Sequence, residues 1–268
     1  MLKSRGGKSQ LLPKVGMRTF YTLIALLLAV SPGPVLAAQP SLYIATESSP
    51  PSSMLEGRTV TGSSTEKVRE IMTRSGLAYR IDLLPWKRAY TSALRRSNGC
   101  VYSTTRTPER EKLFHWIGPL DEAEWVLLAR ADRHYRFTSL EDARGLRIGT
   151  YNGDAREEYL RARGFKVDSA HNDLINPRKL LLNRIDLWAA SLRRGSLVLE
   201  QNGWSASIEP VLTFRKVQVY LACNKGVPET LVIRMQGALD TMERDGSARR
   251  IERKYETWGK HSLAAPGN

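Results

Sequence analysis

Histidine and cysteine are scarce in this chain, with four histidines and two cysteines among 268 residues. The histidines show no spacing typical of metal ligands and stand at positions His115, His134, His171 and His261. No Cys-x-x-Cys, Gly-x-Ser-x-Gly or phosphate-binding Walker loop occurs, so the common signatures of redox, acyl-transfer and nucleotide chemistry are missing. The sequence therefore predicts no metal site, no cofactor and no catalytic residue.

The chain also lacks an apolar run long enough to cross a membrane. The longest, Thr19 to Val30, has twelve residues, whereas a spanning helix needs about 20. It follows Lys14 and Arg18 and leads into a stretch ending in Ala37-Ala38. Basic residues, an apolar run and small residues, in that order, are typical of a secretory signal peptide. We predict a signal over 1–38, cleaved after Ala37 or Ala38, and a soluble periplasmic protein.

Two details of the export segment stay open. Translation starts at Met1 or at Met17, because the residues before Met17 are long and rich in Gly and Lys for a signal peptide. An uncleaved anchor is the alternative to a cleaved signal, and the helix-breaking Pro32 and Pro34 count against it.

Acidic residues are outnumbered, with 27 Asp and Glu against 41 Lys and Arg, a net charge of +14. Five of the basic residues lie in the predicted signal, which contains no acid, so +9 remains beyond it. A positive balance favours anionic ligands or surfaces. Because the basic residues alternate with acids and the protein is predicted to be exported, we expect a solvated basic surface and no nucleic-acid partner.

The two cysteines, Cys100 and Cys223, each lie in a predicted strand. An oxidising compartment permits a disulfide between them. Free cysteines are also commonly buried, so the residues alone leave a bridge and two buried thiols equally open.

Strand-like and helix-like segments alternate twice after the signal, as expected for parallel sheets with crossover helices. The first series has strands at 41–46, 79–84 and 100–103, with helices beginning at Ser63 and Trp86. The second has strands at 146–151, 165–169 and 185–190, with helices at 154–163 and from Asn176. A helix at 192–201, strands at 208–214 and 217–223, and helices from 228 and over 247–258 complete the chain.

Two such series predict an α/β protein with two lobes, each a mainly parallel sheet flanked by helices. We place the first lobe at 39–121 plus 218–260, the second at 122–217, and a tail at 261–268. Ligands collect in clefts between lobes and at the carboxyl ends of parallel strands, so a site is expected there.

The densest polar motif is Ser103-Thr-Thr-Arg-Thr-Pro-Glu-Arg110, directly after the strand at 100–103. It places hydroxyls and a guanidinium at a strand's carboxyl end. An arginine fork can hold a carboxylate with two parallel hydrogen bonds. Thr107-Pro-Glu-Arg is equally a good helix start, with Arg110 as a capping or ion-pairing residue, and the residues themselves do not decide between these roles.

The order of several short segments is similar to that of a known family. The segments are Ser49-Pro-Pro, the helix after Gly62, Leu84-Pro-Trp-Lys-Arg, Thr105-Arg-Thr-Pro-Glu-Arg-Glu, Phe114 to Pro119, Ser139-Leu-Glu-Asp with Ile148-Gly-Thr, and a terminal helix with Asp245-Gly. Over nearly the whole chain beyond the signal, this resembles the extracytoplasmic solute-binding proteins of family 3. These are the polar amino-acid-binding proteins of ABC importers, and they have the type II periplasmic-binding fold.

The resemblance implies four site residues from the first lobe. Arg110 would bind the ligand's carboxylate and Thr105 would add a hydrogen bond. Glu47, just after the first strand, would receive the ligand's amino or amide group. Trp86 is a candidate stacking wall, with a core tryptophan as its alternative reading.

From the second lobe, the resemblance implies that Thr150, Tyr151 and Gly153 offer backbone N–H groups to the same carboxylate. Family members that bind α-amino acids usually carry an aspartate for the ammonium where this chain has Ser191. An unpaired ammonium in a closed cleft is costly. An amino acid, a modified amino acid, a small carboxylate and ammonium capture by Glu47 all stay open.

Taken together, the resemblance implies a monomeric, non-enzymatic binding protein that delivers a small polar ligand to an ABC-transporter permease, its only link to the membrane. The strand order of the family would also make the strands of Cys100 and Cys223 neighbours and allow a disulfide. The alternatives are a dehydratase of the cyclohexadienyl dehydratase type, with Glu47 as general acid, and a ligand-binding chemosensory protein.

Overall fold

The computed structural model describes residues 41–256 and 258. The predicted signal at 1–38, its cleavage site, the two candidate starts and the tail at 261–268 lie outside the described residues. Within the described part, none of the helices combines the length and the apolar character that a membrane span requires.

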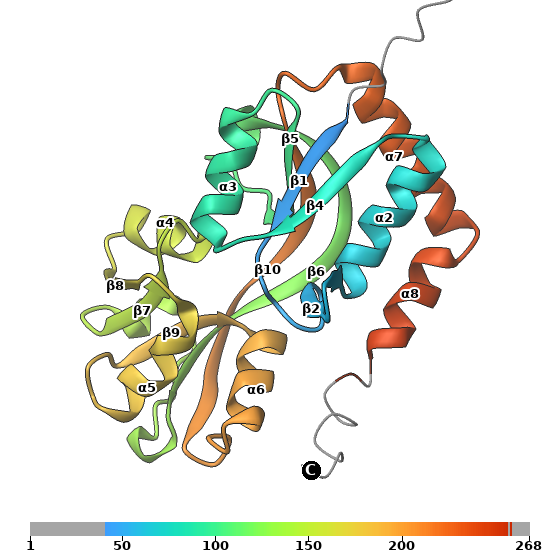
Figure 1. Ribbon diagram of the computed structural model, residues 1–268. Helices are drawn as coiled ribbons and strands as arrows, with labels where there is room; N and C mark the ends of the chain where they lie inside the picture. Colours follow the sequence, from blue (N-terminus) through green and yellow to red (C-terminus); the bar gives the residue numbers. More distant parts are fainter. Residues whose placement is uncertain (1–40, 257, 259–268) are drawn as a thin grey trace, which may run out of the picture. The chain divides into compact units, whose positions relative to one another are not determined.

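A single eight-stranded sheet runs through the protein (Figure 1). Its strands, from edge to edge, are β4 (Tyr79–Leu83), β1 (Leu42–Thr46), β5 (Gly99–Thr105), β10 (Ile208–Asn224), β6 (Phe114–Arg130), β9 (Leu187–Ser191), β7 (Arg147–Tyr151) and β8 (Lys166–Ala170). A hairpin of β2 (Met54–Glu56) and β3 (Thr59–Thr61) stands apart. Pairing is parallel at β4–β1–β5 and at β9–β7–β8, and antiparallel wherever β6 or β10 takes part.

The helices gather around the two ends of this sheet and form two lobes. In the first lobe, α3 (Trp86–Arg95) covers one face, and α2 (Ser63–Ser75), α7 (Glu229–Arg244) and α8 (Ser247–Tyr255) cover the other (Figure 1). The second lobe has α4 (Ala155–Ala162), α5 (Asn176–Leu181) and α6 (Leu192–Gln201). Short 3₁₀ turns occupy Glu111–Leu113, Ala131–Arg133, Leu140–Ala143 and Asp173–Ile175. Separate apolar clusters on the two faces of each lobe make the core, so the α/β two-lobed prediction is confirmed.

Two long strands were not predicted as such. The sequence predicts no strand over most of β6, and it predicts two strands, at 208–214 and 217–223, in place of β10. Both strands have 17 residues and stay paired to each other along their length. The middle of β6 reads Asp121-Glu-Ala-Glu124, which interrupts the apolar pattern used to recognise strands. The lobe boundaries predicted at 121/122 and 217/218 fall inside these strands and stay predictions.

The start of α2 holds the loop that follows β1. The N–H groups of Ser63 and Ser64 donate to the carbonyls of Pro51 and Ser52, each at 3.0 Å. Gly62 has φ 117°, and a Cβ there would lie 2.5 Å from the Ser52 carbonyl oxygen, so only glycine fits. The first turn of α2 thus fixes the loop whose Ser49 and Ser52 face the cavity described below.

Cys100 on β5 and Cys223 on β10 are joined by a disulfide. The two residues are directly opposite each other in the antiparallel pairing of these strands. Both are fully buried in the core between the sheet and helices α2 and α7. The bridge therefore ties the strand that leads into the predicted site to the strand that returns from the second lobe.

Candidate functional site

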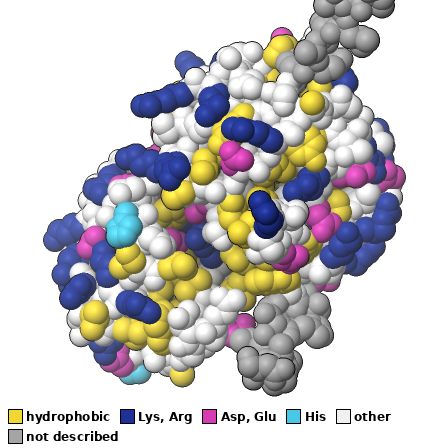
Figure 2. All heavy atoms as spheres, in the orientation of Figure 1, with side chains coloured by type: hydrophobic (Ala, Val, Ile, Leu, Met, Phe, Trp, Pro, Cys, Tyr) yellow, Lys and Arg dark blue, Asp and Glu magenta, His cyan; other side chains and the backbone are white. Residues whose placement is uncertain are grey.

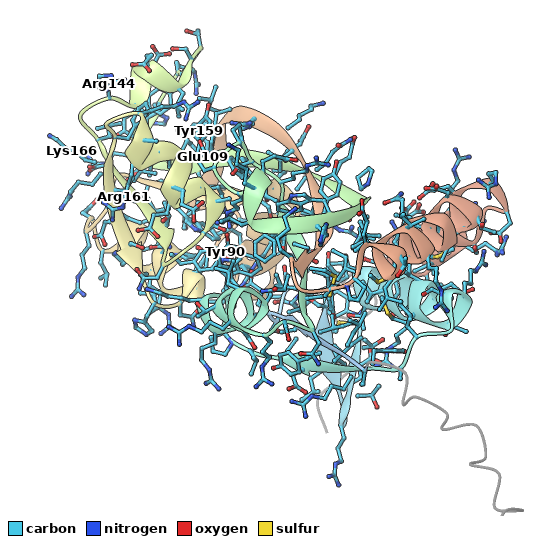
Figure 3. All side chains as sticks on the ribbon, turned by 90° about the horizontal axis from the view of Figure 1, so that it is seen from above. Tyr90, Glu109, Arg144, Tyr159, Arg161 and Lys166 are labelled. Carbon is cyan, nitrogen blue, oxygen red and sulfur yellow. A yellow bond between two sulfur atoms is a disulfide. The ribbon has the colours of Figure 1, made fainter. Side chains whose placement is uncertain are left out.

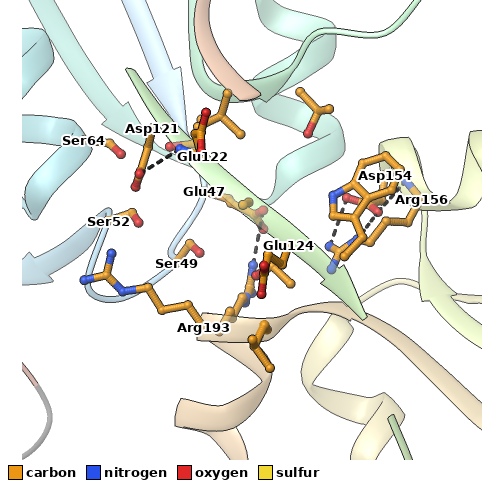
Figure 4. Close-up of a pocket in the computed structure, with 18 of the residues that line it drawn as sticks. Glu47, Ser49, Ser52, Ser64, Asp121, Glu122, Glu124, Asp154, Arg156 and Arg193 are labelled. Atoms are coloured by element: carbon orange, nitrogen blue, oxygen red, sulfur yellow. Dashed lines mark hydrogen bonds and ion pairs between the residues drawn. The ribbon is translucent and has the colours of Figure 1, made fainter. Parts of the chain in front are cut away.

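A cavity of about 340 Å³ lies between the two lobes. Its walls come from the loop after β1, the end of β5, the middle of β6 and β10, and the starts of α4 and α6 (Figure 4). The lining residues are Glu47, Ser49, Pro50, Ser52, Ser64, Ser103, Thr105, Asp121, Glu122, Ala123, Glu124, Trp125, Tyr151, Asp154, Arg156, Ser191, Leu192, Arg193, Arg194 and Val219. The volume and the mixture of hydroxyl, charged and apolar groups suit a small polar molecule.

The structure brings together half of the residues that the sequence assigned to a site. The four that line the cavity are Glu47, Thr105, Tyr151 and Ser191. The four outside its lining are Arg110, Trp86, Thr150 and Gly153. The residues of the second group contact other parts of the protein.

Arg110 is 1% exposed and holds a carboxylate of the protein itself. Its Nε and Nη2 donate to the two carboxylate oxygens of Glu158 on α4, at 2.9 and 2.8 Å. Nη2 also donates to the Gly153 carbonyl at 3.0 Å, and the guanidinium carbon lies 4.7 Å from the centre of the Tyr90 ring. This two-pronged contact is the ion-pairing alternative for Arg110, and its role in binding a ligand stays a prediction.

Trp86 and Gly153 form a second contact between the lobes. The indole Nε1 of Trp86 donates to the Gly153 carbonyl at 2.8 Å, and Trp86 belongs to the core between α3 and the sheet. Thr150 is fully buried at the end of β7, where its carbonyl accepts a hydrogen bond from the Asn176 side chain. These contacts support the core reading of Trp86 over a stacking wall.

Glu47 is the centre of a charged group that spans the cavity. Its Oε1 accepts a hydrogen bond from the Tyr151 hydroxyl at 2.7 Å and lies 3.3 Å from Arg194 Nη1. Burial raises the pKa of Tyr151 well above its usual value, and the charges of Glu47 and Asp154 raise it further. Tyr151 is therefore a hydrogen-bond donor at neutral pH, and it joins the second lobe to the loop after β1.

Asp154 and Arg156, at the start of α4, form a buried ion pair that the sequence reading missed. Arg156 Nε and Nη2 donate to the two carboxylate oxygens of Asp154 at 2.6 and 3.2 Å. Burial by itself would raise the pKa of Asp154, but the charge and hydrogen bonds of Arg156 outweigh it and the pKa lies below its usual value. Arg156 is 5% exposed and its third nitrogen, Nη1, has no hydrogen-bond partner among residues 41–256.

The crossing part of β6 gives the cavity an acidic end. Asp121, Glu122 and Glu124 line it. Lys216 Nζ lies 3.3 Å from Glu124 Oε1. Asp121 and Glu122 have no Lys, Arg or His within ion-pair distance among residues 41–256. In Figure 4, Asp121 and Glu122 lie at one end of the cavity and Asp154 and Arg156 at the other. One end of the cavity therefore has two acids without a basic partner in the described part of the chain, and the other has an arginine already paired with an acid.

Comparison with known proteins identifies the family. Residues 42–257 match the bacterial extracellular solute-binding proteins, family 3. The chain belongs to that family. No curated protein matches its sequence.

Solved structures of the same fold are numerous, and three illustrate their range. A histidine kinase sensor domain with similarity to periplasmic binding proteins has a TM-score of 0.74 at 17% identity, over 81% of this chain and 96% of its own. An ancestral arginine-binding protein bound to arginine has a TM-score of 0.70 at 22% identity, over 81% of this chain and 98% of its own. The arginine-, lysine-, histidine-binding protein ArtJ from Geobacillus stearothermophilus has a TM-score of 0.69 at 17% identity, over 81% of this chain and 95% of its own. At these identities the likeness shows a shared fold.

In this family-3 protein, the basic surface and the charged cavity are separate features. On the face drawn in Figure 2, Lys and Arg side chains are spread over both lobes with Asp and Glu side chains among them. Arg144, Arg161 and Lys166 lie on the outer side of the second lobe, whereas Tyr90 lies where α3 meets that lobe (Figure 3). The positive charge counted in the sequence is thus largely outside the cavity, whose lining contains five carboxylates and three arginines.

Some cavity residues that were not predicted can be found from their place in the sequence, directly after a strand. Asp154 and Arg156 follow β7, and Arg193 and Arg194 follow β9, where the carboxyl ends of strands lead into helices. Charged residues at such places are candidates for ligand contact. No group of three or more His, Cys, Asp or Glu within residues 41–256 has the geometry of a metal site.

Proposed function

We propose that this protein is an extracytoplasmic solute receptor, not an enzyme, which captures a small carboxylate-bearing molecule between its lobes and presents it to an ABC importer. The observation that carries the proposal is the polar cavity of about 340 Å³ walled by both lobes. A ligand there contacts the loop after β1, the crossing strands and the start of α6 together, and so it favours the closed arrangement.

The same cavity counts against the dehydratase alternative. That reaction requires Glu47 to deliver a proton to the substrate. Glu47 Oε1 instead accepts a hydrogen bond from Tyr151 and faces Arg194. Its contacts are those of an acceptor that joins the lobes, and they support binding over proton transfer.

The test is thermal unfolding of the purified protein against amino acids, opines, small carboxylates and polyamines. A ligand at 100 times its Kd adds about 2.7 kcal/mol of stability, a clear rise in Tm. Ser191→Trp, which places a large side chain at a residue that lines the cavity, should abolish the rise. Ser196→Trp, at an exposed position of the helix that follows, is the matched control and should keep it. A panel without any stabilising compound, or a hit that survives Ser191→Trp, counts against the proposal.

The export part of the proposal is tested separately. Expressed from its first codon in a bacterium with a periplasm, the chain should be recovered from that compartment with an intact mass that begins at Ala38 or Gln39. A cytoplasmic product of full mass would refute export, and would also contradict the oxidising environment that the Cys100–Cys223 disulfide requires.

A further inference from the structure

The proposed function leaves open which residue receives the ligand's carboxylate. Arg110 is already saturated on its binding edge, because Nε and Nη2 hold the Glu158 carboxylate and Nη2 also holds the Gly153 carbonyl. Its ring neighbour Tyr90 covers one face of the guanidinium. Arg110 also lies outside the cavity lining, so a ligand in the cavity cannot take the place of Glu158 without opening the contact between the lobes.

Arg156 differs from Arg110 in lining the cavity. Both arginines are buried, and in both Nη1 has no acceptor among the described residues, but only that of Arg156 belongs to a side chain that lines the cavity. A buried guanidinium donor without a partner costs free energy, which an acceptor on a ligand would recover. Asp154 holds Nε and Nη2 and so fixes the direction of the fork.

The start of α6 contributes positive character to the same cavity. Ser191, Leu192, Arg193 and Arg194 line it, and no side chain caps the first turn of this ten-residue helix. The free N–H groups and the positive end of the helix dipole favour an anion. Arg194 adds a guanidinium that is shared with Glu47.

We propose that Arg156, together with the uncapped first turn of α6, receives the carboxylate of the ligand, and that Arg110 serves instead to join the two lobes through Glu158. The proposal rests on the proposed function and deepens it. The ligand's class follows from the two ends of the cavity: a small zwitterion with its carboxylate toward Arg156 and its positive group toward Asp121 and Glu122.

A purely structural role for Arg156 is the competing explanation. Asp154 pairs with it, and Asp173, whose Oδ2 has no hydrogen-bond partner, is a second buried acid that acts on its charge. A structural arginine would influence stability but would not distinguish a carboxylate from an amide in the cavity. The test therefore measures that discrimination, as the ratio of two dissociation constants, rather than affinity alone.

The probes are L-arginine with L-argininamide and agmatine, and L-glutamine and L-glutamate with their α-amides, each titrated calorimetrically into the purified protein. The wild-type protein should bind the carboxylate form about 10- to 100-fold more tightly than the amide. Arg156→Lys should reduce this ratio. The double variant Asp154→Asn with Arg156→Gln, which leaves no unpaired buried charge, should abolish it.

Two controls separate the roles. Arg161→Gln, at an exposed position of the same helix α4, should leave the ratio unchanged. Arg110→Lys should weaken carboxylate and amide alike, because it acts on lobe closure, and so should also leave the ratio unchanged.

A ratio that survives in both Arg156 variants, or that falls in Arg110→Lys alone, overturns the proposal. If agmatine and the amides bind as tightly as the carboxylates, the proposal is overturned while the solute-binding function stands. Binding of no probe, together with no hit in the thermal panel, would overturn both.

Discussion

At the scale of single residues, Arg110 joins the two lobes through the carboxylate of Glu158. The motif at 103–110 leaves a ligand-binding fork and an ion-pairing role equally open, and the structure shows an ion pair with a carboxylate of the protein itself. The motif contained no information on where that carboxylate comes from, since Glu158 is 48 residues away and belongs to the other lobe. The structure makes Glu158 the partner, and the ligand role of Arg110 stays a prediction with this contact against it.

Glu158→Gln should lower the free energy of unfolding by about 1–3 kcal/mol. The variant leaves the Arg110 guanidinium buried without its counter-charge. Because the Glu158 side chain is 38% exposed and solvent screens the pair, we expect a loss of unfolding free energy in the lower part of this range. Urea unfolding gives the value. Glu141→Gln, whose carboxylate pairs with Arg144 and is 63% exposed, is a control expected to change stability less. Equal effects of the two substitutions would contradict the assigned role.

The pair of Asp154 and Arg156 should make stability fall in acid. Because the pKa of Asp154 lies below its usual value in the folded protein, its contribution is present above the ordinary pKa of 3.8 and is lost as the pH falls through the folded pKa. Urea unfolding between about pH 6 and pH 3 measures the loss. The double variant Asp154→Asn with Arg156→Gln should show a shallower fall than the wild-type protein, and an identical fall would remove Asp154 as a cause.

At the scale of secondary-structure elements, local pattern predicted the short strands and the helices but not the two long strands. β1, β4, β5, β7, β8 and β9 have five to seven residues each, so their pattern is visible in a short window. β6 and β10 pass from one lobe to the other and change surroundings on the way, with polar residues in the middle. Their continuity depends on pairing with each other, which is non-local.

The start of α2 is a second case in which non-local contacts decide. The Ser63-x-x-Glu66 spacing reads as a capping box. In the structure the N-cap is Gly62 and no side chain caps the helix. The carbonyls of Pro51 and Ser52 take that role, because the loop after β1 lies against the helix start.

Breaking the disulfide between β5 and β10 should destabilise the protein. Cys100→Ala with Cys223→Ala removes a cross-link that closes a loop of 123 residues, and we expect a loss of about 2–4 kcal/mol in urea unfolding. A thiol count on denatured wild-type protein should find no free cysteine. Two free thiols, or equal stability of the variant, would contradict a formed bridge in the exported protein.

At the scale of the whole described molecule, lobe closure is supported by contacts of the chain itself. Arg110 to Glu158, Trp86 to Gly153, and Tyr151 to Glu47 each join the two lobes without a ligand. Closure in the absence of ligand should therefore be favoured more than in a protein whose lobes meet only through the bound molecule.

Weakening two of these contacts should shift the ligand-free protein toward an open form. In Glu158→Gln with Trp86→Phe, each loss of about 1.4 kcal/mol raises the ratio of open to closed tenfold. Small-angle X-ray scattering should then give a larger radius of gyration than for the wild-type protein. Arg161→Gln is the control, and an unchanged radius in the double variant would show that these contacts do not hold the lobes together.

The sequence by itself determined the α/β class, the two-lobed family, most short elements and the edge of the sheet where a site forms, because these follow from local pattern and the order of segments. Tertiary structure alone decided which charged groups are already paired. Glu158 meets Arg110 and Glu47 meets Arg194 only once the lobes come together. Pairing depends on distances of a few ångströms between distant residues, and one chain's sequence does not contain those distances before it folds.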